Sequence, residues 1–259
     1  MNVIERIGER TIAFFEYAGG LTDLAGNAFS FLFRARIRVN ESVSQAYLLG
    51  YQSLSIVLLT SLFTGMVISL ESAVQAVQYG FGSIVGTAVA YASGRELGPL
   101  LTGIVVAGRG GSAIAAEIGS MVVTEQIAAL RSMGIEPARF LVVPRLLALL
   151  VMLPLLTVFA DVISIVGGMW VAKAYAHIAY PDFLQAARNG ISMIDFEKGL
   201  LKSLVFAAII ALVGSFQGLR TRGGAAGVGR ATTGAVVVSM ILIFIANFAL
   251  SLILYGSSA

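Results

Sequence analysis

The chain has 259 residues, of which 58% are hydrophobic and only 12% are charged, and its formal net charge is +3. Soluble globular domains carry roughly 25% charged residues, so this composition argues against an ordinary soluble domain and predicts an integral membrane protein. The chain has no cysteine and one histidine, which excludes disulfides, a cysteine nucleophile and metal sites built from thiolates or several histidines. The basic residues lie in short clusters between apolar runs, unlike a nucleic-acid-binding surface.

Residues 1–42 are expected to form an N-terminal interfacial segment. Residues 1–16 mix acidic and basic side chains and lack the continuous apolar core of a secretory signal peptide. Their apolar face favours an amphipathic helix in the membrane interface, and a solvated helix packed on its own protein is the alternative. The apolar patch at 28–33 is too short to span and is expected to complete this segment. The residues of the apolar face are Ile4, Ile7, Thr11, Phe14 and Phe15.

Residues 43–259 are expected to form a transmembrane domain. A spanning helix needs about 20 predominantly apolar residues. Pro154 lies inside the third of the qualifying stretches, and Asn247 interrupts the fifth. The fold class is therefore an all-α integral membrane protein with an N-terminal interfacial helix and five transmembrane helices. The five stretches are roughly 46–70, 83–107, 146–172, 199–219 and 232–255.

The orientation follows from the distribution of Lys and Arg, which favour cytoplasmic loops. Basic residues precede the first stretch and occupy the loops between the second and third and between the fourth and fifth. The loop after the first stretch and the C-terminal tail have none. This predicts a cytoplasmic N-terminus and an outer C-terminus, although the connection between the third and fourth stretches is mixed. Trp170, Tyr175 and Tyr180 are expected to form an aromatic belt at the outer end of the third helix. The cytoplasmic loops would hold Arg109, Arg131, Arg139 and Arg145, then Arg220, Arg222 and Arg230.

Small residues recur every fourth position along two of these stretches, which lets helices approach closely in lipid. We interpret both stripes as packing faces, against a helix of the same chain or of a second copy. One stripe is Gly86, Ala90, Gly94 and Gly98; the other is Ala207, Ala211 and Ser215, with Gly214 and Gly218 beside it.

Arg95 and Glu96 lie near the centre of the second stretch, about twelve residues from either end. A charge at mid-bilayer costs roughly 2.5–3.5 kcal/mol on insertion scales, so it normally faces a partner or a water-filled cavity. Pro99 and the neighbouring glycines would permit a local break in the helix. These residues are expected either to bind a substrate or to form a structural ion pair.

Two further polar groups lie toward the predicted outer side. Glu71, Gln75 and Tyr79 share one helix face, which would either contact a polar headgroup or be solvated. Asp195 and Lys202 are seven residues apart on one face of the fourth helix, where Lys202 could extend toward a lipid phosphate.

Asp161 is a buried acid of the third helix. Asp161 and Asp195 are each expected either to pair with Arg95 or to bind the substrate. Asp195 is counted with the substrate-binding residues, and for Asp161 a structural role is favoured.

The loop between the second and third helices contains a short amphipathic helix, about 121–134. Ile127, Leu130 and Met133 form its apolar stripe, and Gly134 and Pro137 are stop signals. Such a helix either lies on the membrane or docks on a partner as a coupling helix.

The sequence resembles the MlaE/YrbE permease family, the membrane subunits of ABC transporters linked to MCE proteins. The resemblance covers about residues 45–255. It rests on Gly94–Pro99, Ala107–Ala113, Ala116–Gly119 and the run from Glu125-Gln126 through Met133-Gly134 to Pro137, with Phe63–Met66 and Gly229–Thr233 as further matches.

The resemblance implies a homodimeric permease that moves phospholipid between the inner membrane and a periplasmic MCE ring, maintaining outer-membrane lipid asymmetry. It implies a cytoplasmic ATPase dimer that binds ATP and Mg, and leaves room for a small cytoplasmic accessory subunit. It also implies that Arg95, Glu96 and Lys202 border the lipid cavity. The coupling helix would contact the ATPase through Glu125, Gln126, Leu130 and Arg131.

The chain itself is not expected to be an enzyme or to hold a cofactor. It has no G-x-x-x-x-G-K-[ST] motif, and the glycine-rich run Gly223–Gly229 lacks the lysine and the preceding strand. Two other functions remain open on the residues alone. One is an ion- or proton-coupled secondary transporter using Arg95, Glu96 and Asp161 as a relay, although no inverted repeat is visible. The other is a non-transporting membrane scaffold.

Overall fold

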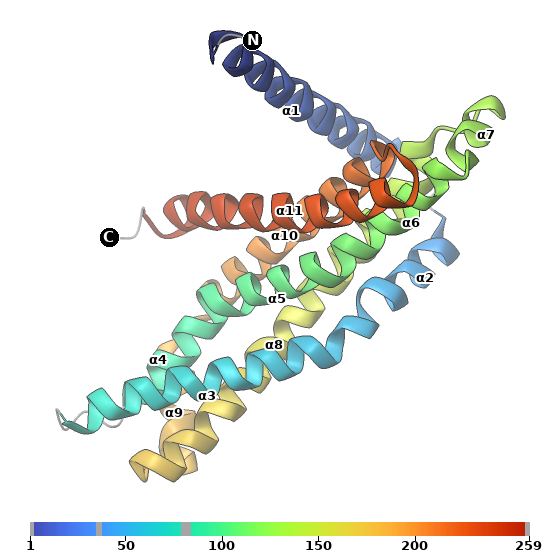
Figure 1. Cartoon of the computed structure of the whole chain (residues 1–259). Helices are drawn as coiled ribbons and strands as arrows, with labels where there is room; N and C mark the ends of the chain where they lie inside the picture. Colours follow the sequence, from blue (N-terminus) through green and yellow to red (C-terminus); the bar gives the residue numbers. More distant parts are fainter. Residues whose placement is uncertain (1–2, 35–37, 79–83, 257–259) are drawn as a thin grey trace.

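The computed structural model describes residues 3–34, 38–78 and 84–256, and these ranges are helical with no strand, which confirms the predicted all-α fold (Figure 1). In chain order the elements are α1 (Val3–Arg34), α2 (Val39–Leu49), η1 (Tyr51–Ser53), α3 (Leu54–Gln78), α4 (Val85–Ala92), η3 (Ser93–Leu97), α5 (Gly98–Val106), η4 (Ala107–Gly111), α6 (Ser112–Val123), α7 (Gln126–Ser132), η5 (Ala138–Val142), α8 (Val143–Ala176), α9 (Tyr180–Gly190), α10 (Met193–Leu219) and α11 (Gly224–Tyr255). η1 is a short 3₁₀ turn, whereas η3, η4 and η5 are π-helical turns built into longer helices.

Among the described residues, five helical segments are long and apolar enough to cross a membrane, as predicted. The second and third contain 39 residues each, or about 58 Å of helix at 1.5 Å per residue. Since the hydrocarbon core is only about 30 Å thick, these segments must tilt or extend beyond it. The five spans are Val39–Ala76, Val85–Val123, Ala138–Ala176, Met193–Leu219 and Gly224–Tyr255.

The spans extend into regions that the apolar pattern assigned to loops, and there the prediction was wrong. Arg109 lies in η4, and Arg145 is a buried residue of α8 rather than a loop residue. Asp195 lies in the first turn of α10, on the fourth helix as predicted. The physical reason is that a helix satisfies its own backbone hydrogen bonds whatever its side chains are, so it can continue past its apolar stretch.

The first span is interrupted between α2 and α3 by the short turn η1. The side chain of Arg109 from η4 forms hydrogen bonds with residues at this interruption. Its Nη1 donates to the Leu48 carbonyl at 2.8 Å and to Ser53 Oγ at 3.0 Å, and its Nη2 donates to Gln52 Oε1. The end of a helix leaves carbonyls without intrahelical donors, and a cation near the C-terminus also complements the helix dipole. Arg109, which belongs to the second span, therefore stabilises the break in the first span.

α3 and α8 pack closely because glycines remove the side chains between them. A Cβ on Gly65 would lie 2.0 Å from the Ser164 carbonyl oxygen, and one on Gly167 would lie 2.5 Å from the Leu62 carbonyl oxygen. Ser69 Oγ donates to the Gly168 carbonyl at 2.7 Å across the same contact. These glycines were not part of the predicted stripes.

The two predicted stripes are packing faces within the chain. Gly86 of α4 meets α9, where an added Cβ would lie 2.3 Å from the Phe183 carbonyl oxygen. Gly214 of α10 meets η4 and α6, with an added Cβ 3.0 Å from the Gly111 carbonyl oxygen. The partner of each stripe, which the sequence left open, is therefore another helix of the same chain.

α10 is the central helix of the bundle, and α11 lies on its outside. The most apolar stretch of α10 is 67% buried inside the protein, whereas that of α11 is only 11% buried. The buried positions of α11 follow one narrow stripe through Ala231, Ala235 and Ser239. Large apolar side chains cover its remaining surface, with Val237, Ile241, Phe244, Ile245, Phe248, Leu252 and Ile253 all at least 50% exposed.

The second half of α1 packs on the bundle, whereas its N-terminal end points away from it (Figure 1). Leu24 and Ala28 are buried in the main core. Gln217 Nε2 donates to Tyr17 Oη at 2.9 Å, and the Tyr17 ring meets Phe216 edge to face. Burial raises the pKa of Tyr17 above its ordinary value. The second half of α1 thus packs on the rest of the chain, and the interfacial position of residues 1–42 stays a prediction.

The glycine contact between α3 and α8 gives a stability prediction. Gly65→Ala places a methyl group against a backbone oxygen that cannot rotate away, so we expect a loss of about 1–3 kcal/mol, the usual cost of overpacking. Gly229→Ala in α11 is the matched control, because nothing lies within 4 Å of an added Cβ there. Thermal unfolding of the purified protein in detergent checks both, and equal midpoints for the two variants would contradict close packing at Gly65.

Candidate functional site

The second span forms a π-helical turn, η3, at the position where the sequence places Arg95 and Glu96. Pro99 has no N–H to donate to the Arg95 carbonyl four residues earlier, and that carbonyl instead accepts a hydrogen bond from Lys202 Nζ at 3.3 Å. Single π-helical turns inside α-helices are frequent at functional sites. The predicted break near Pro99 is therefore present, as a widened turn.

This turn does not lie at the middle of the helical segment Val85–Val123, which is longer than the predicted apolar stretch. Arg95 comes about ten residues, or roughly 15 Å, after Val85, and 28 residues before Val123. The charges therefore lie toward the end of the span where α4 begins. The turn is off-centre because the segment continues through η4 and α6, beyond the apolar stretch that was counted. The depth of the two charges in the membrane stays a prediction.

Glu96 and Lys202 form an ion pair in which the lysine is fully buried. Nζ and Oε1 are 2.7 Å apart, and the exposed fraction of the side chain is 0% for Lys202 and 34% for Glu96. Ser251 Oγ accepts from Lys202 Nζ at 2.8 Å and lies 3.0 Å from Glu96 Oε1. Asn247 Nδ2 donates to Glu96 Oε2 at 3.1 Å. The pair thus joins η3, α10 and α11.

Arg95 lies beside this pair and is held by rings and one carboxylate. Its guanidinium is 3.3 Å from the centroid of the Tyr255 ring and 4.9 Å from that of Tyr91, whose hydroxyl it also hydrogen-bonds. Asp195 Oδ1 is 3.9 Å from Arg95 Nη1. Lys198 Nζ, 4.8 Å from the Tyr255 ring, donates to the Leu254 carbonyl at 2.7 Å. Cation–π contacts of this kind hold the basic groups without neutralising them.

We call these residues the polar cluster: Arg95, Glu96, Asp195, Lys198, Lys202, Asn247, Ser251 and Tyr255. Three of its side chains are cationic and two are anionic, which leaves an excess of one positive charge. Arg95 and Asp195 remain partly accessible, with 20% and 22% of their side-chain surfaces exposed. A partly open site with excess positive charge attracts an anionic group such as a phosphate.

The structure brings together four of the predicted site residues, namely Arg95, Glu96, Asp195 and Lys202. Asp195 lies 3.9 Å from Arg95, so the structure shows the pairing that the sequence left open, and its role in substrate binding stays a prediction. Glu71 and Gln75 are exposed residues near the end of α3 and are not members of the polar cluster. Tyr79 lies outside the described residues.

Sequence reasoning missed the contribution of α11. Asn247 was noticed only as an interruption, and Ser251 and Tyr255 were not singled out. The three are spaced at i, i+4 and i+8, which places them on one helix face. Polar residues repeating on one face of an otherwise apolar span were the signal that could have identified them.

Asp161 does not pair with Arg95, contrary to the expectation. It is 4% exposed, and neither carboxylate oxygen has a hydrogen-bond partner among the residues that the structure describes. An added Cβ on Gly98 would lie 1.7 Å from Asp161 Oδ1, so the glycine makes room for the carboxyl group. The helix turns Gly98 toward α8 and Arg95 toward α10 and α11, which separates the two groups.

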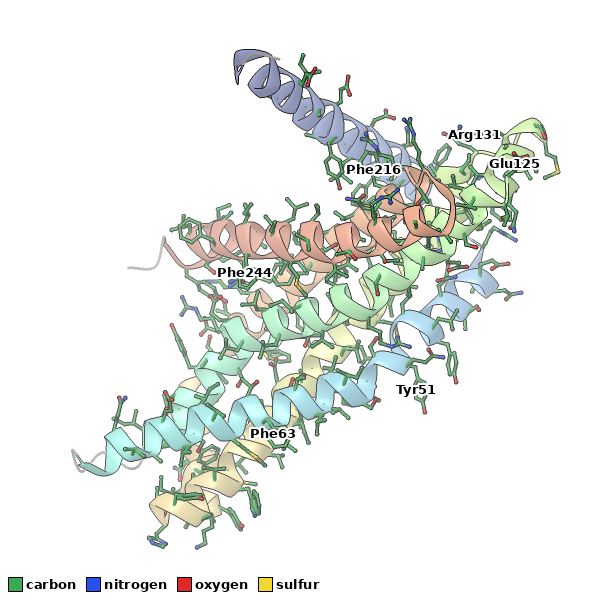
Figure 2. The ribbon with its side chains drawn as sticks, viewed as in Figure 1. Tyr51, Phe63, Glu125, Arg131, Phe216 and Phe244 are labelled. Carbon is green, nitrogen blue, oxygen red and sulfur yellow. The ribbon has the colours of Figure 1, made fainter. Side chains whose placement is uncertain are left out.

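The expected coupling helix is α7, which is shorter than predicted because residues 121–123 belong to α6. Glu125 joins the two helices in a left-handed conformation with φ of 60°. Ile127 is buried and Leu130 is half-buried against the core, but Met133 is 64% exposed, so the predicted apolar stripe turns inward only in part. Glu125, Gln126 and Arg131 are exposed. Figure 2 shows Glu125 and Arg131 at the end of the molecule opposite α9.

α6 and α8 are joined near α7 by a further ion pair. Arg145 Nη2 lies 2.7 Å from Glu117 Oε2, and Arg145 Nη1 donates to the Leu141 carbonyl at 2.7 Å. Arg145 is 3% exposed, so this contact fixes the base of α6 against α8.

Comparison with known proteins places the chain among membrane permeases. Residues 42–253 match the family described as Permease MlaE. The chain is 41% identical to a probable ABC transporter permease protein of Synechocystis over 90% of this chain and 88% of that protein. It is 36% identical to a probable ABC transporter permease protein of Rickettsia felis over 96% of each. It is also 37% identical, over 88% of this chain and 65% of the relative, to the chloroplast protein TRIGALACTOSYLDIACYLGLYCEROL 1 of Arabidopsis thaliana.

The unequal burial of the Glu96–Lys202 pair gives a prediction for a double-mutant cycle. Removing one partner of a buried pair costs about 3–5 kcal/mol because the other charge is left uncompensated. Glu96→Leu strands the fully buried Lys202, so we expect it to lower the free energy of unfolding more than Lys202→Met, which leaves the partly exposed Glu96. The double variant should recover part of the loss. Additive effects in chemical denaturation would show that the two side chains are not coupled.

Proposed function

The chain belongs to the MlaE family of ABC transporter permeases, and from that premise we propose that its cargo is phospholipid. The phospholipid moves between the inner membrane and a periplasmic path of MCE proteins, and this transport maintains the lipid asymmetry of the outer membrane. The observation that carries the proposal is the polar cluster, a set of charges between η3, α10 and α11 with one positive charge in excess.

The chemistry of the polar cluster suits a phospholipid headgroup. A phosphate needs charge-assisted donors. Arg95 supplies them at the accessible side of the cluster, and Lys198 contacts the same Tyr255 ring. Glu96 and Lys202 neutralise each other and form the wall of the site. Glu71 and Gln75, near the end of α3, remain candidates for a separate contact with the headgroup region.

A second copy of the chain is the proposed partner of α11. Only 11% of the most apolar stretch of α11 is buried, and apolar side chains at least half exposed cover much of the helix. Its polar face, with Asn247 and Ser251, belongs to the polar cluster. Dimerisation along α11 would therefore bring two clusters toward a shared cavity between the copies.

In the proposed orientation the N-terminus is cytoplasmic and the C-terminus periplasmic, in the bacterial inner membrane. The second span then starts on the periplasmic side, and the polar cluster lies roughly 15 Å along the helix from that start, nearer to it than to the cytoplasmic end at Val123. α7 lies on the cytoplasmic side, where the separate ATPase dimer of the transporter, which binds ATP and Mg, would dock, with a small accessory subunit as a further partner.

The name of one relative also supports a lipid cargo. The Arabidopsis protein is named for trigalactosyldiacylglycerol, a glycolipid built on diacylglycerol. This lipid shares the two acyl chains of a phospholipid but lacks its phosphate, so the excess positive charge of the polar cluster is what favours phosphate-bearing lipids here.

The test of the proposed function combines co-purification with lipid transfer. A tagged chain purified under native conditions should bring down a nucleotide-binding subunit and a second copy of itself. Lipid transfer by the reconstituted complex should be lost in Glu96→Lys and kept in Asp182→Lys, an exposed charge reversal on α9. Recovery of no ATPase, or undiminished transfer by Glu96→Lys, would refute the proposal.

The exposed turn before α7 gives a separate prediction. Glu125→Lys should abolish transport while leaving the dimer and its bound lipid intact, because the residue is far from the polar cluster and exposed. Glu125→Gly removes the carboxylate and relieves the left-handed backbone, which costs a non-glycine residue roughly 1 kcal/mol. We expect it to impair transport without lowering the unfolding midpoint. Normal transport by Glu125→Lys in the vesicle assay would exclude coupling through this turn.

A further inference from the structure

A groove lies at the opposite end of the bundle from the polar cluster, between the end of α1, the start of α2 and the start of α8. It encloses about 380 Å³, within the range of ligand pockets, roughly 300–1,000 Å³. Its floor is apolar, formed by Phe31, Phe140 and Leu147 among others. Its rim carries Arg38, Glu136 and Arg139.

The position of the groove places it at headgroup depth. The first span begins at Val39 and the third at Ala138, and residues on both sides of these two starts line the groove. In a chain that crosses the membrane alternately, the first and third spans start on the same side. The apolar floor therefore continues into the hydrocarbon region while the charged rim lies at its boundary, an arrangement that suits an amphiphile.

The rim carries charges of both signs, which points to a zwitterion rather than a simple anion. Arg38 is engaged within the protein, since it pairs with Glu41 at 3.2 Å and lies 4.2 Å above the Phe140 ring. Glu136 and Arg139 are both exposed. They are three residues apart in a helical turn that the Phe140 N–H closes by donating to the Glu136 carbonyl at 3.1 Å. Side chains at this spacing are neighbours, so the rim presents one anionic and one cationic group side by side.

We propose that this groove binds a zwitterionic phospholipid of the ethanolamine type from the adjoining leaflet. Its phosphate contacts Arg139, its ammonium contacts Glu136 and its acyl chains cover the floor around Phe140 and Leu147. The site is separate from the polar cluster and holds a resident lipid rather than cargo. It would join the end of α1 to α2 and α8, and it does not depend on the proposed transport function.

The test is native mass spectrometry of the purified full-length chain after delipidation. Dioleoylphosphatidylethanolamine, dioleoylphosphatidylglycerol and dioleoylglycerol are added in turn. We expect the ethanolamine lipid to be retained best and dioleoylglycerol least. Arg139→Glu should weaken retention of the ethanolamine lipid roughly tenfold, the size expected for loss of one charge-assisted hydrogen bond. Glu136→Gln should shift the preference toward dioleoylphosphatidylglycerol, because no carboxylate is left to repel its anionic headgroup.

Three controls distinguish binding in this groove from non-specific lipid retention, from a folding defect and from binding at the polar cluster. Arg188→Glu, an exposed charge reversal on α9 at the other end of the bundle, should keep the lipid. Arg139→Lys keeps the charge and should retain partial binding, which guards against a folding defect in Arg139→Glu. Arg95→Gln, at the accessible side of the polar cluster, should leave this adduct unchanged, so that failure of the cargo site and of this site are distinguishable. Three outcomes would each overturn the proposal. The first is retention of dioleoylglycerol equal to that of the ethanolamine lipid, and the second is a loss of lipid in Arg188→Glu equal to that in Arg139→Glu. The third is dissociation of a dimer in Arg139→Glu, which would indicate that a second copy of the chain covers the groove.

Discussion

The ammonium group of Lys202 is the polar group on which the arrangement of three helices depends. A lysine with no exposed side-chain surface is costly unless its donors are satisfied. Lys202 has three N–H donors, and it meets three acceptors: Glu96, Ser251 and the Arg95 carbonyl. These acceptors come from η3 and α11, while the lysine comes from α10. The widened turn, the central helix and the outer helix are therefore interdependent, since a shift of any one of them would leave a buried charge without a partner.

The same constraint explains why the irregular turns of this bundle coincide with basic side chains. Backbone groups inside a membrane must be satisfied within the protein, so a break in a span needs a polar side chain close to it. Lys202 takes the carbonyl that Pro99 leaves free, and Arg109 in η4 takes the Leu48 carbonyl at the end of α2. Charged residues thus permit the spans to bend, and one of these bends also holds Arg95 and Glu96 of the polar cluster.

The two ends of the proposed transport machinery are joined by one continuous helical segment. Val85–Val123 runs from α4 through η3 and η4 to α6. Arg95 and Glu96 of the polar cluster lie in this segment, and the turn before α7 follows its end. The Glu117–Arg145 pair ties the base of this segment to α8. If an ATPase displaces α7, the movement would pass to α8 through the Glu117–Arg145 pair. It would pass to η3 along the segment Val85–Val123, in which the π-helical turn η4 lies between α6 and η3.

The amino-acid sequence alone was enough to predict the fold class, the five spans and most charged residues of the site, because burial in lipid imposes an apolar length that can be counted along the chain. It also indicated the packing stripes, since close approach in lipid requires small residues at regular spacing. The ends of the spans could not be counted in this way, because α6 and the first turns of α8 remain helical without a continuous apolar stretch. The tertiary structure was needed to establish which charges meet: Arg95 pairs with Asp195 and not with Asp161, and Lys202 is completed by Ser251 from α11. Those pairings depend on the rotation and crossing of helices that are 49 to 155 residues apart in sequence, and no local pattern of residues specifies that geometry.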